Sequence, residues 1–63
     1  MASLQSLQVL LVDDNQHMRA ITSAILQSAG MKKVIEASDG AAALDVLRDH
    51  NIDLAIVDFN MFP

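Results

Sequence analysis

Cysteine is absent from this 63-residue chain, which also has one proline, two glycines and two aromatic residues, both phenylalanine. Without cysteine the chain can form no disulfide and no thiolate zinc site. Its two histidines, His17 and His50, are too few and too far apart for a structural metal clip. A chain this short buries only about 60% of its surface on folding, so its stability is marginal. Such chains usually gain stability from a partner, or they are part of a larger unit.

Basic residues are also scarce: four stand against eight acidic residues, which gives a formal net charge of −4. Nucleic-acid binders carry a basic stripe, and the sequence has none, so we expect no nucleic-acid partner. No apolar run is long enough to cross a bilayer, and residues 1–6 lack the basic and apolar parts of a secretory signal. We therefore expect a cytoplasmic protein without membrane contact, in which residues 1–6 form a flexible leader.

Hydrophobic residues make up 52% of the chain, which is enough material for a core. Apolar runs bounded by polar residues predict strands at 7–12, 32–37 and 52–57. Apolar residues three and four apart predict helices at 16–29 and 41–51. Alternating strands and helices with short loops are typical of an α/β fold with a parallel sheet.

The helical spacing also predicts which side of each helix faces the sheet. The predicted inward stripe of the first helix is Met18, Ile21, Ile25 and Ala29, widened by Leu26. That of the second helix is Ala41, Leu44 and Leu47, with Val46 beside it. The polar side of the first helix is predicted to carry Arg19, Thr22, Ser23 and Gln27. Gly30 then follows as the residue expected to end this helix in the left-handed conformation.

Aspartates follow two of the predicted strands, Asp13 and Asp14 after the first and Asp58 after the third. Ligands bind beyond the carboxyl ends of the strands in open parallel sheets, so we expect the three carboxylates to converge if the two strands are neighbours. Oxygen ligands suit Mg²⁺, and a carboxylate beside that ion can accept a phosphoryl group. The same residue types also serve as helix caps and turn residues, and Asn15 or Asp14 can cap the first helix.

Four segments together resemble the receiver domain of response regulators in two-component signalling. They are VLLVDDN at 9–15, EASDG at 36–40, AL at 43–44 and DLAIVDFNM at 53–61. The resemblance covers residues 7–61 and implies a flavodoxin-like, doubly wound parallel sheet. Residues 7–63 would form the first, βαβαβ half of that fold, a truncated receiver with strand order 2-1-3.

The resemblance implies roles for four residues. Asp58 corresponds to the phosphoacceptor, Asp13 and Asp14 to the acidic pair that holds Mg²⁺, and the backbone carbonyl of Asn60 to a further metal ligand. A sensor histidine kinase or phosphotransfer protein would be the partner, and no autonomous enzyme activity is implied.

The sequence departs from the family pattern in two respects. The hydroxyl residue at the end of the family's fourth strand and the lysine at the end of its fifth have no counterpart in this chain. Phe62 also stands between Met61 and Pro63, where the family usually has proline directly after methionine.

Right-handed crossovers would place the two helices on opposite faces of a 2-1-3 sheet and the third strand at its edge. That strand, from Ile52 to Val57, is almost wholly apolar, which makes it a template for pairing with another strand. We therefore predict a homodimer through this edge, with either a continuous six-stranded sheet or an exchange of elements between protomers.

Three hypotheses about function remain open. The chain can be a signalling module that binds Mg²⁺ and accepts phosphate at Asp58. It can instead be an interaction module that pairs with itself or docks on a partner and keeps a vestigial acidic site. It can also be a fragment whose function is that of a whole receiver. The acidic residues favour the first hypothesis, and the missing hydroxyl and lysine together with the open edge favour the second.

Overall fold

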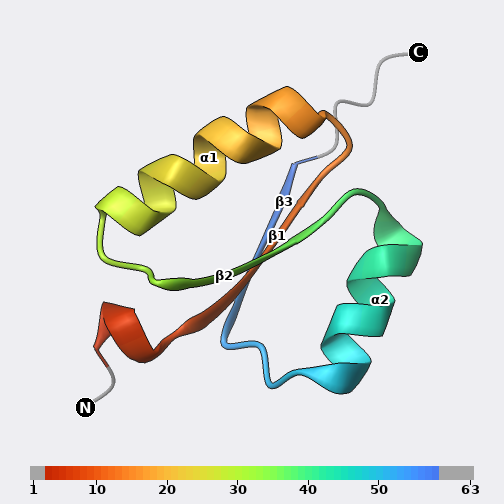
Figure 1. Ribbon diagram of the computed structural model, residues 1–63. Helices are drawn as coiled ribbons and strands as arrows, with labels where there is room; N and C mark the ends of the chain where they lie inside the picture. The colour runs from red at the N-terminus through yellow and green to blue at the C-terminus, as the bar shows by residue number, and fades with distance from the viewer. Residues whose placement is uncertain (1–2, 59–63) are drawn as a thin grey trace.

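The computed structural model describes residues 3–58, and its elements follow the predicted order of strands and helices (Figure 1). Every observed boundary lies within two residues of the predicted one. The elements are β1 Gln8–Asp13, α1 Gln16–Ser28, β2 Lys33–Ala37, α2 Gly40–Asp49 and β3 Leu54–Asp58, preceded by a 3₁₀ turn at Leu4–Ser6. Within residues 3–58, no helix has the length and apolar character needed to pass through a membrane.

The three strands form one parallel sheet in the order β2-β1-β3, which confirms the predicted topology. Val9 of β1 pairs with Val34 of β2 on one side and with Leu54 of β3 on the other. Figure 1 shows α1 and α2 on opposite sides of this sheet. Right-handed crossovers produce this arrangement when the chain steps first to one side of β1 and then to the other. The architecture is the predicted half of a flavodoxin-like fold.

β1 supplies most of the core. Its apolar residues are each at most 1% exposed, namely Val9, Leu10, Leu11 and Val12. Such a run is expected where a strand is paired on both edges and covered on both faces. Because side chains alternate along a strand, Leu10 and Val12 pack with Ala37 and Ala43 under α2, and the other two residues point toward α1.

The predicted inward stripe of α1 is wrong except for Leu26, which is half-buried. Met18 and Ile21 are each 44% exposed and Ile25 is 62% exposed, whereas Ser23 is only 6% exposed. The more buried side of the helix carries Arg19, Thr22, Ser23 and Leu26. Helical spacing identifies which residues share a side, but the side that meets the sheet depends on where the helix lies. α1 lies over β1 and β2 with its small and polar residues inward, which leaves the apolar stripe at the surface.

The inward stripe predicted for α2 is wrong for the same reason, and only Val46 beside it lies toward the core. Leu44 is 67% exposed and Leu47 is 47% exposed, whereas Ala43 is buried and Val46 packs partly buried against the core. Like α1, α2 packs on β1 and β2. Both helices therefore approach the sheet through a small side chain and present large apolar side chains to solvent.

β3 lies at the edge of the sheet, as predicted, but it runs from Leu54 to Asp58 and not from 52 to 57. Leu54 is 38% exposed and Val57 is 52% exposed, so this strand is much less covered than β1. Asp53 precedes the strand and anchors the start of β1: its carboxylate Oδ2 accepts from the Gln8 amide at 2.9 Å, and its own amide donates to the Gln8 carbonyl at 2.9 Å.

Gly30 follows α1 with a φ of 110°, which confirms that the helix ends in a left-handed glycine. An L side chain rarely adopts this conformation, so glycine is the residue suited to the turn between α1 and β2.

The assignment of the core predicts that Leu10→Ala lowers the free energy of unfolding by about 2–5 kcal/mol, because Leu10 is buried against both Ala37 and Ala43. A domain of this size holds only about 3–5 kcal/mol, so the variant should be largely unfolded in water. Urea denaturation followed by circular dichroism measures the loss. Leu4→Ala removes the same atoms from a leucine that is 47% exposed; it is the matched control and should change the stability by less than about 0.5 kcal/mol. Similar losses in both variants would contradict the assigned core.

Candidate functional site

The carboxyl ends of β1 and β3 bring two aspartates to one place in the sheet. Asp13 is the last residue of β1 and Asp58 is the last residue of β3, and the two are register partners across the parallel pair. Residues at paired positions of neighbouring parallel strands project from the same face of the sheet. For these two residues that face is the one covered by α1, since Asp13 alternates with Val12, which packs under α2.

The two carboxylates differ in burial. Asp13 is only 1% exposed, although its side chain is a carboxyl group, whereas Asp58 is exposed. The Oδ1 atom of Asp13 accepts a hydrogen bond from the Asn15 amide at 2.9 Å. Among residues 3–58, the other oxygen of this carboxylate has no recorded hydrogen-bond donor. Asp13 therefore has one oxygen held by the turn and one left for another ligand.

The turn after β1 is closed by Asn15, which resolves the two capping alternatives that the sequence allowed. The Asn15 side-chain oxygen Oδ1 accepts from the Met18 amide at 3.1 Å, and Asn15 is the N-cap of α1. Asp14 precedes the cap and is exposed. A role as the helix cap therefore does not account for Asp14.

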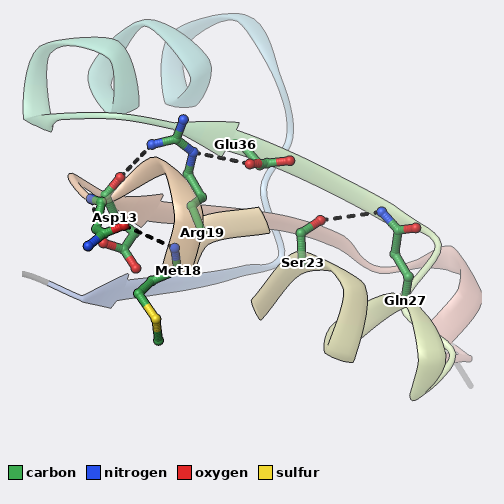
Figure 2. A network of polar contacts seen from close by, with 7 residues as sticks. Asp13, Met18, Arg19, Ser23, Gln27 and Glu36 are labelled. Atoms are coloured by element: carbon green, nitrogen blue, oxygen red, sulfur yellow. Dashed lines mark hydrogen bonds and ion pairs between the residues drawn. The ribbon is translucent and has the colours of Figure 1, made fainter. Parts of the chain in front are cut away.

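Arg19 joins this turn to the rest of the sheet, as Figure 2 shows. Its Nη1 donates to the backbone carbonyl of Asp13 at 2.6 Å, and its Nε donates to Glu36 Oε1 on β2 at 3.1 Å. The Arg19 side chain is 14% exposed and the Glu36 side chain 43%. Sequence reasoning placed Arg19 on the polar outer side of α1 and missed this role. No local signal could have found it, because the contact depends on which side of α1 meets the sheet.

Most other acidic side chains of the described residues hold the fold together. Asp39 caps α2 by accepting from the Ala42 amide at 2.8 Å, Asp53 anchors β1, and Asp45 pairs with Arg48 on the outside of α2. Within residues 3–58, the side chains of Asp14 and Asp58 make no hydrogen bond or ion pair. Asp14 and Asp58 are thus two acidic residues at the carboxyl end of the sheet whose side chains have no structural contact within residues 3–58.

Only some of the predicted metal ligands belong to the part of the chain that the structure describes. Asn60, whose carbonyl the resemblance adds to the site, lies outside the described residues, as do Phe62 and Pro63. Residues 3–58 contain no group of three or more His, Cys, Asp or Glu side chains gathered closely enough to hold a metal ion. The structure therefore pairs Asp13 with Asp58 by register, and the binding of Mg²⁺ stays a prediction.

Comparison with known proteins places residues 9–62 in one family model, described as the response regulator receiver domain. The chain is 39% identical over 54 residues to the CAI-1 autoinducer sensor kinase/phosphatase CqsS of Vibrio cholerae, which aligns 86% of this chain and 8% of that protein. It is 35% identical over 57 residues to the chemotaxis protein CheY-3 of Vibrio cholerae, which aligns 90% of this chain and 44% of the relative.

A third relative is the chemotaxis protein CheY of Bacillus subtilis, 37% identical over 54 residues, with 86% of this chain and 45% of the relative aligned. The chain thus spans less than half the length of each of these three curated relatives.

The cap assignment predicts that Asn15→Ala lowers the free energy of unfolding by about 1 kcal/mol, because the Met18 amide loses its acceptor. Asn15→Ser keeps an oxygen at the cap and should retain most of the stability. Thermal or urea unfolding measures both variants. If alanine and serine give the same stability, the side-chain cap contributes nothing and the assignment is wrong.

Proposed function

This chain belongs to the response regulator receiver domain family, and on that premise we propose that Asp58 accepts a phosphoryl group in a site that Asp13 and Asp14 complete with Mg²⁺. The observation that carries the proposal is the register pairing of Asp13 with Asp58 at the carboxyl end of the sheet. Asp14 and Asp58 are exposed there, and the structural roles of the neighbouring polar residues leave both carboxylates available.

The donor chemistry fits Mg²⁺. This ion keeps several waters and uses one or two carboxylates, so a site need not gather three acidic side chains to hold it. Asp13 offers one carboxylate oxygen that the turn does not use, and Asp58 offers its exposed carboxylate. When bound, the ion would neutralise negative charge on the phosphoryl oxygens.

In the proposed reaction, an oxygen of the Asp58 carboxylate bonds to the phosphorus atom of a phosphohistidine donor. The bond between that phosphorus and the donor's imidazole nitrogen breaks, and the nitrogen keeps the electron pair. Asp58 then carries an acyl phosphate.

A sensor histidine kinase or phosphotransfer protein is the donor that we propose, and one relative of this chain is itself named a sensor kinase/phosphatase. The chain would act as a signalling module and not as an autonomous enzyme. Its cytoplasmic location stays a prediction.

The signalling proposal predicts that Mg²⁺ with beryllofluoride, which mimics a phosphoryl group on aspartate, shifts the amide NMR signals of Asp13, Asp14 and Asp58 in a saturable way. The physical reason is that the mimic adds a group to the exposed Asp58 carboxylate beside its register partner Asp13.

Asp58→Ala should abolish the response to beryllofluoride, because the acceptor oxygen is gone. Asp49→Ala, which removes an exposed carboxylate at the end of α2, is the matched control and should respond like the unchanged chain. Absence of a saturable shift in the unchanged chain would overturn the signalling proposal.

A second candidate function, self-association, is favoured by a different observation. β3 is paired with β1 along one edge only among the described residues, and its residues Leu54 to Val57 carry no charge. Large apolar side chains are also exposed on α1, α2 and β3: Met18, Ile21, Ile25, Leu44, Leu47, Leu54 and Val57. We propose a second copy of this chain as the occupant.

The strand itself suggests a register for such a dimer. Two β3 strands related by a two-fold axis through Ile56 would run antiparallel, with Ala55 opposite Val57 and Leu54 opposite Asp58 of the partner copy. No like charges face each other in this register, and facing like charges would be destabilising. Strand edges alone bury little of the ~800 Å² per partner that a specific interface needs. The apolar stripes of α1 and α2 would therefore have to join the interface.

The self-association proposal predicts a dimer at micromolar concentration by sedimentation velocity and a monomer for Ala55→Lys, because a lysine on an edge strand discourages pairing. Ala55 is exposed, so the substitution should cost the monomer little.

Ala20→Lys makes the same change on the exposed side of α1 and should leave the dimer intact. A folded monomer for the unchanged chain, or equal sedimentation of the two variants, would contradict the proposed interface.

A further inference from the structure

We infer that Arg19 is a positioning residue for the acidic site: it holds the peptide group between Asp13 and Asp14 in the orientation that Mg²⁺ binding requires. The inference rests on the proposed function, since it concerns the same site. It starts from the two contacts of the Arg19 guanidinium, one to the Asp13 carbonyl at 2.6 Å and one to Glu36 at 3.1 Å (Figure 2).

The first contact acts on both aspartates at once. The carbonyl that accepts from Arg19 belongs to the planar peptide that joins Asp13 to Asp14. A change in the backbone dihedrals on either side of this peptide would change how the two side chains are oriented relative to each other. The Asn15 amide holds the Asp13 carboxylate from the other side, at 2.9 Å. Arg19 and the turn together therefore leave this pair of acidic residues little freedom to rearrange.

The second contact determines where the guanidinium can lie. Glu36 projects from β2 on the same face of the sheet as Asp13, because its register partner Leu11 lies two residues before Asp13 on β1. Arg19 reaches both from α1, so three elements meet at one side chain that is only 14% exposed. A charge in such a place interacts more strongly with its neighbours than one in water does.

Glu36 also has an electrostatic consequence for the site. A cationic guanidinium so close to the Asp13 backbone would repel an incoming dication if it stood alone. The Glu36 carboxylate offsets that charge, so Arg19 can orient the turn while adding little net positive charge beside the carboxylates. Outer partners of metal ligands typically change metal affinity by about 10–100-fold when they are removed.

A purely structural role is the competing explanation. Arg19 fastens α1 to β2, so its loss could weaken the fold and leave the site unchanged in every molecule that is still folded. Metal affinity measured on the NMR signals of the folded state separates the two explanations. A structural role alone would lower the unfolding free energy without changing that affinity.

The experiment titrates Mg²⁺ into the unchanged chain and into Arg19→Met, following the Asp13, Asp14 and Asp58 amides of the folded state. We expect about tenfold weaker binding in Arg19→Met, together with faster metal-free hydrogen exchange at the Asp14 and Asn15 amides. Arg19→Lys keeps the charge but has one donor nitrogen in place of the two that contact Glu36 and the Asp13 carbonyl. Arg19→Lys and Glu36→Gln should each weaken binding to a smaller extent. These two milder variants carry the test if Arg19→Met does not fold.

The chain offers a matched control. Arg48 makes an ion pair with Asp45 on the outside of α2, and its side chain is 71% exposed. Arg48→Met removes the same chemical group away from the turn, so it should leave the Mg²⁺ affinity and the exchange of Asp14 and Asn15 unchanged.

The outcomes separate this inference from the proposed function. If the unchanged chain binds Mg²⁺ and the Arg19 and Glu36 variants bind it equally well, the positioning role is wrong and the acidic site stands. If the unchanged chain shows no saturable response, the proposed function fails, and the positioning role fails with it. The titration of the unchanged chain alone tells these two results apart.

Discussion

The burial of β1 is the constraint on which the rest of the structure depends. A strand with four apolar residues in a row can leave water only if it is paired on both edges and covered on both faces. β2 and β3 meet the first requirement, and α1 and α2 the second. With one helix between each pair of successive strands, right-handed crossovers then leave a single arrangement, in which the two helices lie on opposite faces of the sheet.

That constraint also creates the acidic site. Because β1 and β3 run in parallel register, the residue that ends each strand stands beside its counterpart, and both residues are aspartates. Asp13 is buried because it ends the buried strand β1. A buried polar group is costly unless it has hydrogen-bond partners. The Asn15 amide donates to the Asp13 carboxylate, and the Arg19 guanidinium donates to the Asp13 backbone carbonyl. Asp58, on the edge strand, is exposed to solvent.

The helices show how close packing and surface chemistry are linked. Ser23 and Ala43 are small, and their burial lets each helix approach the sheet closely. The large apolar residues of the same helices, such as Ile25 and Leu44, consequently lie at the surface. Exposed apolar side chains of this size, next to an edge strand, are the kind of surface that protein interfaces use. The core and the proposed interface are therefore two results of the same packing.

The sequence by itself determined the order of the elements, the apolar character of β1, the left-handed glycine after α1 and the aspartates at the two strand ends. Each of these follows from local composition and spacing, which depend only on residues close together in the chain. Tertiary structure alone decided which side of each helix is buried, that Asn15 and not Asp14 caps α1, and that Arg19 binds the Asp13 carbonyl and Glu36. Helical periodicity is the same for every rotation of a helix about its axis, so only the packing of α1 on β1 and β2 could turn Arg19 inward.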